Sequence, residues 1–382
     1  MRRIYLDHAS TTPLAPEVFE AMLPWMGDRF GNASSPHARG AAVRDAVERA
    51  RAEVAALVGS APEEIVFTGS ASEANNLALK GVARARREGA HRLLAASTEH
   101  ISVLHPLRTL EREGFPVALL PVDRTGILDA EELARSLTGD TLLLSVAHAS
   151  GEIGTLQPLE AICRAAHARG VMVHSDATLS AGAVSWPTGE DAPDLATLTP
   201  HLFYGPPGIG ALRVRRGVRL GPLIEGGAQE GGLRAGTEAV APIVGFGVAA
   251  RLALAEREAR AARASTLADR LRDLLPRRLD GVVPTGHPER RLPGHVSLCL
   301  RGVEAEAVLQ ALDEEGIEAS SGSACTTEVR KPSHVLEALG IEPLLARGAL
   351  TLSFGEMSRE GDAECVAAAL VGIVTRLRRL SP

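Results

Sequence analysis

Four cysteines and two lysines limit the covalent chemistry open to this chain of 382 residues. Cys325 lies in SSGSACTT (320–327), a run of small polar residues that cannot pack as a core. A thiol there is expected to be exposed, which suits a thiolate nucleophile or a persulfide carrier better than an incidental surface thiol. The other cysteines stand in helix-like or apolar stretches and are predicted to be packing residues: Cys163, Cys299 and Cys365.

Lys80 and Lys331 are the only candidates for a mechanism that needs an amine nucleophile, because the other basic side chains are arginine or histidine. GC-rich codon usage is the plainer explanation of the preference for arginine, but the small number of lysines limits the chemistry in either case. The cysteines form no CxxC pair, so neither a zinc ribbon nor a thioredoxin-like motif fits.

Hydroxyl and imidazole side chains follow the first predicted strands. Residues 68–73 (TGSASE) end a strand and open a helix, where free backbone N–H groups attract an anion. The alternative for this segment is an ordinary helix N-cap at Ser72. His100 stands where the next strand gives way to a helix, and a single histidine there is more often structural than catalytic.

A carboxylate and further hydroxyls follow the later strands. Asp176 ends one strand, where a carboxylate either orients the cationic group of a cofactor or, with about equal weight, is a helix N-cap or a solvated turn carboxylate. The polar turn 148–154 (HASGEIG) follows another strand, and Thr199 with His201 ends the next. Each signal is weak alone, but together they favour a phosphate-bearing cofactor at one edge of one sheet.

The elements that position these side chains alternate between apolar strands and helix-like segments. Continuous apolar strands separated by helices indicate an α/β fold with a mostly parallel sheet, whose ligands bind at the carboxyl ends of the strands. The predicted strands are 65–68, 92–97, 116–122, 141–147, 171–175, 194–199 and 209–214. The predicted helices between them lie near 73–88, 101–113, 130–137 and 157–169.

A change of pattern after Pro284 predicts a second, smaller domain, entered by a long helix over about 239–275. We predict a large domain of residues 15–255 and a small α+β domain of residues 1–14 and 256–382 that carries Cys325. The elements predicted after Pro284 are a strand at 295–300, a helix at 303–315, segments at 317–325 and 350–355, and a helix at 361–379.

Composition excludes several classes of protein. Hydrophobic residues make up 45% and charged residues 23%, which is ordinary for a globular chain and unlike a disordered or fibrous one. No run approaches the ~20 apolar residues of a membrane span, and the N-terminus lacks the apolar core of a signal peptide, so a cytoplasmic protein is expected. The net charge of -6 is spread along the chain, so no nucleic-acid partner is expected.

Several segments resemble the cysteine desulfurases, which are pyridoxal-phosphate (PLP) enzymes of the class V aminotransferase group. The resemblance extends over nearly the whole chain and implies a fold-type I PLP-dependent transferase architecture, with a mostly parallel seven-stranded sheet and a small α+β C-terminal domain. The spacing from Cys325 to Pro332 is similar to the longer-loop type that supplies iron–sulfur cluster assembly. The matching motifs are YLDHASTTPLAPEV (5–18), FGNASSPHARG (30–40), FTGSASEANNLALKG (67–81), GEIGT (151–155), HSDAT (174–178), FYGPPGIGALRVRR (203–216), GGAQEGGLRAGT (226–237), SSGSACTT (320–327) and PSHVLEALG (332–340).

The resemblance also implies roles for individual residues. Asp176 would face the pyridine nitrogen of PLP, His100 would stack on its ring, and Cys325 would carry the transferred sulfur. The resemblance implies that the phosphate is held by two hydroxyls, an imidazole and a threonine donated across a dimer interface: Ser72, Thr199, His201 and Thr237.

The residues that would act on the substrate depart from the family pattern. Leu202 occupies the position of the lysine that forms the Schiff base with PLP, and neither Lys80 nor Lys331 is placed to replace it. Losing a charge-assisted carboxylate contact costs about 1.5–3 kcal/mol. Losing a positioned proton-transfer group costs roughly 10²–10⁴ in rate. Further family side chains, including a glutamine, an asparagine and two arginines, are replaced at Leu179, Gly151, Thr351 and Gly231.

Because these losses cluster at one site, the leading hypothesis is a degenerate cysteine desulfurase homologue, unable to perform standard PLP Schiff-base catalysis, that acts as a sulfur-handling or partner subunit. The alternative is an active desulfurase that transfers sulfur from L-cysteine to Cys325. A second alternative is a different enzyme or ligand-binding protein on the same scaffold. PLP would bind without covalent attachment or not at all. The expected partners are a second copy in a homodimer or an intact desulfurase in a heterodimer, and a sulfur-acceptor or iron–sulfur scaffold protein.

Overall fold

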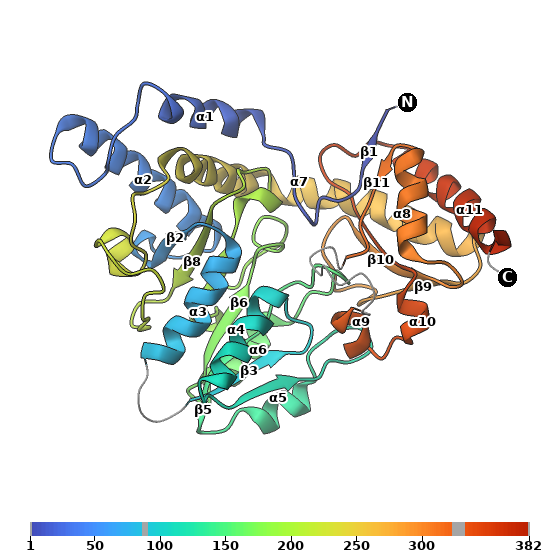
Figure 1. Ribbon diagram of the computed structural model, residues 1–382, viewed down its shortest axis with the longest axis horizontal. Coiled ribbons are helices and arrows are strands. Elements are labelled where there is room, and N and C mark those ends of the chain that lie inside the picture. Colours follow the sequence, from blue (N-terminus) through green and yellow to red (C-terminus); the bar gives the residue numbers. More distant parts are fainter. Residues whose placement is uncertain (1, 86–90, 323–332, 381–382) are drawn as a thin grey trace.

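The computed structural model describes residues 2–85, 91–322 and 333–380 (Figure 1). Cys325 and Lys331 therefore lie outside the described residues. No helix within the described ranges is both long and apolar enough to cross a lipid bilayer.

A seven-stranded sheet forms the centre of the larger part of the molecule. Four neighbouring pairs in it are parallel, and only β8 runs antiparallel to its neighbours β2 and β7. The predicted mostly parallel sheet is confirmed, and every strand lies within two residues of its expected bounds. In spatial order the strands are β2 (Ile65–Thr68), β8 (Gly210–Val214), β7 (Leu195–Leu198), β6 (Met172–Asp176), β5 (Thr141–Ser145), β3 (Arg92–Ala96) and β4 (Val117–Leu120).

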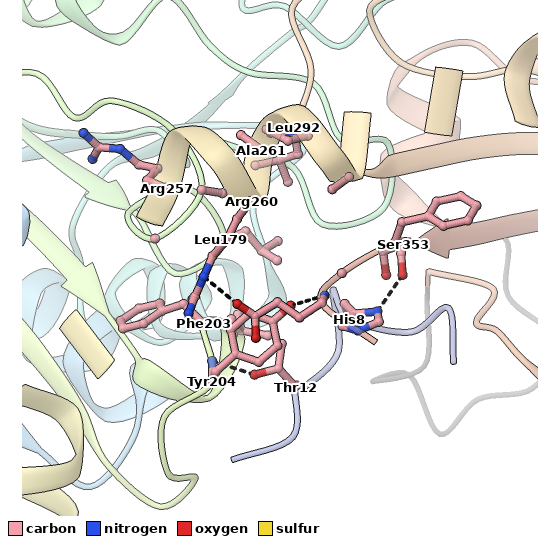
Figure 2. Close-up of a pocket in the computed structure, with 18 of the residues that line it drawn as sticks. His8, Thr12, Leu179, Phe203, Tyr204, Arg257, Arg260, Ala261, Leu292 and Ser353 are labelled. Carbon is pink, nitrogen blue, oxygen red and sulfur yellow. Dashed lines mark hydrogen bonds and ion pairs between the residues drawn. The ribbon is translucent and has the colours of Figure 1, made fainter. Parts of the chain in front are cut away.

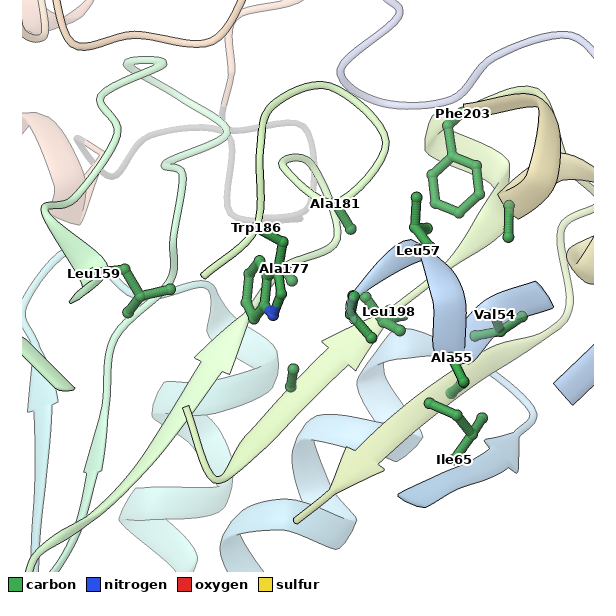
Figure 3. Close-up of a cluster of buried hydrophobic side chains, with 14 of the residues drawn as sticks. Val54, Ala55, Leu57, Ile65, Leu159, Ala177, Ala181, Trp186, Leu198 and Phe203 are labelled. Atoms are coloured by element: carbon green, nitrogen blue, oxygen red, sulfur yellow. The ribbon is translucent and has the colours of Figure 1, made fainter. Parts of the chain in front are cut away.

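Helices cover both faces of this sheet, because successive strand residues point to opposite sides. Val66 and Leu93 belong to one apolar core, while their chain neighbours Phe67 and Leu94 belong to the other. Part of the second core is drawn in Figure 3, where Leu198 lies beside Ala177 and Trp186. The first core also holds α3 (Ala71–Ala85) and α4 (Ile101–Arg112), and the second holds parts of α1 (Pro16–Met26), α2 (Ala38–Leu57), α5 (Ala130–Ser136) and α6 (Leu159–His167).

The long helix α7 (Val240–Arg278) links the two parts of the molecule. Its first half contributes Phe246 to a core of the seven-stranded sheet, and its second half contributes Leu271 to a separate core. In Figure 1 this helix runs from one part across to the other. The predicted domain bounds at residues 15 and 256 stay predictions.

The second part is built on a small antiparallel sheet of the order β12 (Ala349–Ser353), β10 (His295–Leu300) and β9 (Val282–Pro284). The N-terminal strand β1 (Ile4–Tyr5) pairs in parallel with β11 (Ile317–Glu318), so the two ends of the chain share this part. The remaining helices here are α8 (Ala305–Glu314), α9 (His334–Ala338), α10 (Pro343–Ala346) and α11 (Asp362–Leu380).

Two local predictions are wrong. Helix α3 begins at Ala71, and the Ser70 hydroxyl, not Ser72, accepts the Glu73 N–H at 3.1 Å, because serine three residues before glutamate forms a capping-box pair. Cys365 is exposed, because the buried face of α11 follows Ala363, Val366 and Leu370 and residue 365 lies outside that stripe. Cys163 and Cys299 are buried, as predicted.

Candidate functional site

The carboxylate of Asp176 is fixed at the carboxyl end of β6. Its Oδ2 accepts a hydrogen bond from Asn75 Nδ2 at 2.8 Å, and its Oδ1 accepts from the Thr178 backbone N–H at 3.0 Å. No helix follows Asp176 directly and the residue is buried, so neither alternative, a helix cap or a solvated turn carboxylate, holds. Both oxygens are oriented, which suits a carboxylate that faces a cation.

His100 is connected to Asp176 through two side chains. Asn75 Nδ2 also donates to Ser102 Oγ at 2.8 Å, and Ser102 Oγ lies 2.7 Å from His100 Nδ1. The Ser102 backbone N–H also donates to His100 Nδ1 at 3.2 Å, so Nδ1 is an acceptor and the proton of the neutral ring is on Nε2. Burial lowers the pKa of His100, which favours the same neutral ring, and the side chain keeps an exposed face. We call Asn75, His100, Ser102 and Asp176 the ring edge.

The predicted phosphate-binding groups lie on three segments: Thr199 and His201 follow β7, Ser72 is in α3, and Thr237 precedes α7. Thr199 donates to the Ile209 carbonyl oxygen at 3.0 Å, and His201 Nδ1 lies 3.3 Å from Thr11 Oγ1. The Ser72 hydroxyl is exposed on the first turn of α3, where unpaired backbone N–H groups favour an anion. Thr237 is exposed in the loop that precedes α7, and its predicted role across a dimer interface stays a prediction.

Leu202 lies at the end of a short 3-10 turn after β7 and lines a cavity of about 590 Å³. Leu179 and Phe203 form an apolar wall of the cavity beside Leu202, and α7 lines the other side of the cavity with Arg260 (Figure 2). Arg260 pairs with Glu356 at 2.6 Å. Leu202 thus stands in an apolar wall of this cavity.

Of the other departures from the family pattern, Gly151, Leu179 and Thr351 lie near this wall. Gly231 does not, because it stands apart in the turn Gln229–Gly232, so the expectation that all the losses cluster at one site is wrong for that residue. A Cβ atom on Gly151 would lie 3.1 Å from Leu179 Cδ1, so these two positions touch. Thr351 is buried in β12 and donates its hydroxyl proton to the Glu152 carbonyl oxygen at 3.1 Å. We call Gly151, Leu179, Leu202 and Thr351 the altered corner.

A half-buried carboxylate lies beside this corner. Glu152 Oε2 accepts a hydrogen bond from the Ser333 hydroxyl, and burial raises the pKa of Glu152 to about 7. Where the resemblance predicts an arginine for a substrate carboxylate, this chain therefore has a threonine that contacts an acidic residue.

The lysine within the described ranges lies away from the ring edge. The pKa of Glu113 is lowered by its hydrogen bond to Arg84 and by a smaller effect of Lys80, which places Lys80 near the residue that follows α4. His100 caps the opposite end of that helix, whose 12 residues span about 18 Å at ~1.5 Å each. The expectation that Lys80 cannot replace the missing lysine agrees with this position. Lys331 lies outside the described residues.

Sequence reasoning missed two residues of the site. Asn75 is fully buried and joins Asp176 to Ser102. One signal for it was present in the sequence, because asparagine is a poor helix former and Asn75 stands inside a predicted helix. Glu99 is also buried, with Oε1 accepting from the Ala147 N–H at 2.6 Å. Burial raises the pKa of Glu99 well above its usual range, and nothing in the sequence distinguishes it from a solvated glutamate.

Residues 4–365 match the aminotransferase class-V family. The chain is 42% identical to cysteine desulfurase IscS 1 of Archaeoglobus fulgidus over 379 residues, which covers 99% of this chain and 98% of that one. It is 40% identical to IscS of Dictyoglomus turgidum, covering 100% of this chain and 97% of that one. Among solved structures, a NifS-like protein aligns with a TM-score of 0.92 at 31% identity, covering 98% of this chain and 100% of that one.

The fold and the comparisons together place the chain in the aminotransferase class-V family, with the fold-type I architecture of its PLP enzymes. Within that family it belongs with the IscS cysteine desulfurases.

The residues present fit the ring and phosphate of PLP better than its covalent attachment. Asp176 is oriented by two donors, and the Asn75 carboxamide oxygen is buried without a partner among the described residues. His100 presents a neutral ring with an exposed face. Leu202, which the resemblance places at the position of the attachment lysine, offers no amine.

Proposed function

We propose that this chain is a cysteine desulfurase homologue without covalent PLP attachment, which acts in sulfur mobilisation as a sulfur-handling or partner subunit through Cys325. The observation that carries the proposal is Leu202, an apolar side chain in the wall of a cavity, together with the remote position of Lys80. The relatives of this chain that are named cysteine desulfurases supply the sulfur chemistry of the proposal.

The ring edge supports retained binding of a PLP-like ring. Bound PLP supplies an electron sink for bond cleavage at the α-carbon of an amino acid. Asp176 would hold the charged pyridine nitrogen, because Asn75 and Thr178 fix both of its oxygens. His100 would lie on the ring as a neutral imidazole with its proton on Nε2. The phosphate would be held by Ser72, Thr199 and His201.

The altered corner supports loss of the standard reaction. A missing lysine removes the group that would move a proton at the substrate, and such a loss costs roughly 10²–10⁴ in rate. Thr351 provides no positive charge for a substrate carboxylate, and its hydroxyl is already bonded to the Glu152 carbonyl oxygen.

Borohydride reduction with added PLP, followed by peptide mass spectrometry, tests the proposal. We expect no pyridoxyl group on Lys80 or Lys331, because any PLP that binds is held without a covalent bond. A pyridoxyl group at stoichiometric yield on either lysine would overturn the proposal.

The intact ring edge and the 40–42% identity to IscS proteins favour one second candidate. In it, PLP binds without a covalent bond and sulfur passes from L-cysteine to Cys325. A yellow protein that forms a persulfide on Cys325 with L-cysteine would establish this candidate instead. A colourless protein that binds another phosphate ligand would support a different function on the same scaffold.

We also propose a dimer as the basic unit. Helix α1 exposes a row of large apolar side chains at helical spacing, with exposed fractions of 52% for Phe19, 55% for Leu23 and 70% for Met26. A homodimer is the simpler assembly, and a heterodimer with an intact desulfurase would give Thr237 a role in the partner's site. Light scattering should find a dimer, and a monomer would contradict this proposal. Co-purification without any intact desulfurase would remove the heterodimer.

A further inference from the structure

The cavity between helix α7 and the N-terminal segment has a wall that suits an apolar ligand. Its volume of about 590 Å³ is that of a site for a small organic molecule. The ring edge, all of whose residues the structure describes, contributes nothing to its lining, while the altered corner contributes Leu179 and Leu202. Phe203, Leu292 and Phe354 extend the apolar surface. Such a wall favours a ligand with an apolar body.

Arg260 supplies this cavity with a buried hydrogen-bond donor. Its Nε lies 2.6 Å from Glu356 Oε1 and its Nη2 lies 2.7 Å from Glu256 Oε2. Its Nη1 is buried and has no partner among the described residues. Because two carboxylates already balance the charge of this guanidinium, a third anion beside them would be repelled, whereas a neutral oxygen could accept from Nη1.

Two further arginines line the cavity without facing this donor. Arg263 is exposed and donates to the Ser358 carbonyl oxygen at 2.7 Å. Arg257 is half-buried, and Figure 2 shows its guanidinium turned away from Arg260 and His8. The polar end of the cavity near Arg260 therefore gains no positive charge from either side chain.

His8 supplies a buried acceptor at the same end. Its Nδ1 lies 2.8 Å from the Ser353 carbonyl oxygen, so Nδ1 carries the proton and Nε2 accepts. That Nε2 is buried without a partner among the described residues. A Cβ on Gly355 would lie 2.6 Å from it, and the next residue is Glu356, which pairs with Arg260. The unpaired donor and the unpaired acceptor thus stand on two neighbouring residues of one segment.

We propose that this cavity binds an uncharged molecule that has an apolar body and one hydroxyl or primary amide group. The oxygen of that group would accept from Arg260, and its hydrogen would be donated to His8 Nε2. A buried polar atom without a partner costs stability, so two of them in one cavity point to an occupant. Water would satisfy them poorly, because an ordered water needs two to four polar partners and most of this wall is apolar.

Isothermal titration calorimetry with three probes of one carbon skeleton tests the ligand class. The probes are phenylbutanol, phenylbutanoate and phenylbutylamine, which differ in the charge of the end group. We expect phenylbutanol to bind with a Kd on the order of 0.1–1 mM. The two charged probes should bind at least about tenfold more weakly, because a buried charge without an opposite partner is costlier than a hydrogen-bonded hydroxyl.

Three variants locate the binding. Ala261→Leu extends a side chain from α7 into the cavity and should weaken phenylbutanol by at least about fivefold. Ala262→Leu changes the exposed neighbour, which does not line the cavity, and is the matched control with no expected change. His8→Asn keeps a donor for the Ser353 carbonyl oxygen without an acceptor at Nε2, and should weaken binding by about fivefold, the value of one hydrogen bond.

Circular dichroism confirms that each variant is folded. The inference is overturned if phenylbutanol does not bind, if phenylbutanoate binds more tightly than phenylbutanol, or if folded Ala261→Leu binds phenylbutanol as the unchanged chain does. The titration needs neither PLP nor Cys325, so such a failure would leave the proposed function standing. A pyridoxyl-lysine adduct would overturn the proposed function without affecting the titration.

Discussion

The ring edge and the altered corner lie at the same end of the sheet and have opposite characters. In the ring edge, Asn75, Ser102 and Asp176 form a continuous hydrogen-bonded chain to His100. In the altered corner, Gly151 and Leu179 meet through apolar contact, and Leu202 lines a mostly apolar cavity. A chain whose former site was under no functional constraint would be expected to lose the polar side chains of both regions. The difference indicates that binding at the ring edge and chemistry at the corner are separable in this protein.

Restoring polar side chains at the altered corner should give the largest effect, an increase in the rate of sulfide release. We expect Leu202→Lys alone to show little release of sulfide from L-cysteine, because the substrate carboxylate still lacks an arginine and position 179 is still apolar. Adding Thr351→Arg and Leu179→Gln should raise the rate by roughly 10–150-fold over the single variant, which is the value of one restored charge-assisted contact.

Sulfide release measured with excess PLP checks this prediction. The unchanged chain and Thr351→Arg alone are the controls. Full activity of the single Leu202→Lys variant would show that the other three positions of the corner do not limit the reaction.

The ring edge is expected to depend on Asn75 for its stability as well as its geometry. Asn75→Ala should lower the free energy of unfolding by about 2–4 kcal/mol, because it removes donors from the buried Asp176 and from Ser102. Urea denaturation measures the change. Asn76→Ala is the matched control, since among the described residues the side chain of that neighbour bonds to the Ser72 carbonyl oxygen alone, on the exposed side of the helix. Equal losses of unfolding free energy in the two variants would show that the hydrogen bonds of the ring edge stabilise the chain no more than a hydrogen bond on the helix surface does.

The pH dependence of stability should report Glu152. Its pKa is raised from the usual 4.5 to about 7 in the folded chain, so its contribution to stability is complete below pH 4.5 and is lost as the pH rises through 7. Glu152→Gln cannot titrate and should therefore be more stable than the unchanged chain at pH 8 by about 3 kcal/mol, with the difference vanishing near pH 4.

Urea denaturation of both proteins from pH 4 to 8 checks this difference. The titratable groups that contact the same turn, His295 and Arg291, are present in both proteins, so the comparison isolates residue 152. A constant difference across this range would mean that Glu152 keeps its ordinary pKa.

The sequence was sufficient for the sheet because its strands are continuous apolar runs, which the 3.6-residue pattern of a helix does not imitate. It did not predict α2, whose arginines and glutamates interrupt an alanine-rich buried face and leave little contrast between its two sides. It also placed the cap of α3 at Ser72 rather than Ser70, although the capping-box spacing to Glu73 was present.

The site was harder to predict than the fold, because its linking residues are identified only by what they touch. Asp176 and His100 stand at strand ends and could be selected by position. Asn75 lies inside a helix and Glu99 next to His100, and only the folded chain shows that both are buried. The contact between Gly151 and Leu179 joins residues 28 positions apart, which no local pattern reveals.

That contact leads to the prediction with the smallest effect. An added side chain at position 151 would begin 3.1 Å from Leu179 Cδ1, which is tighter than ordinary packing. Gly151→Asn should therefore destabilise the chain by about 1–3 kcal/mol, because Leu179 must move and the new amide faces an apolar group. Leu179→Gln in the same chain should recover about 1 kcal/mol or more of that loss, because an amide at 179 gives the asparagine a partner.

A double-mutant cycle in urea measures the coupling between the two positions. Leu179→Gln alone is one arm of the cycle, and Asn76→Ala combined with Gly151→Asn is a control pair without an expected coupling. If the changes in the free energy of unfolding at positions 151 and 179 were strictly additive, the two positions would be independent of each other. A favourable coupling would show that the altered corner is one packed unit, so that the polar side chains of the family have to be restored together.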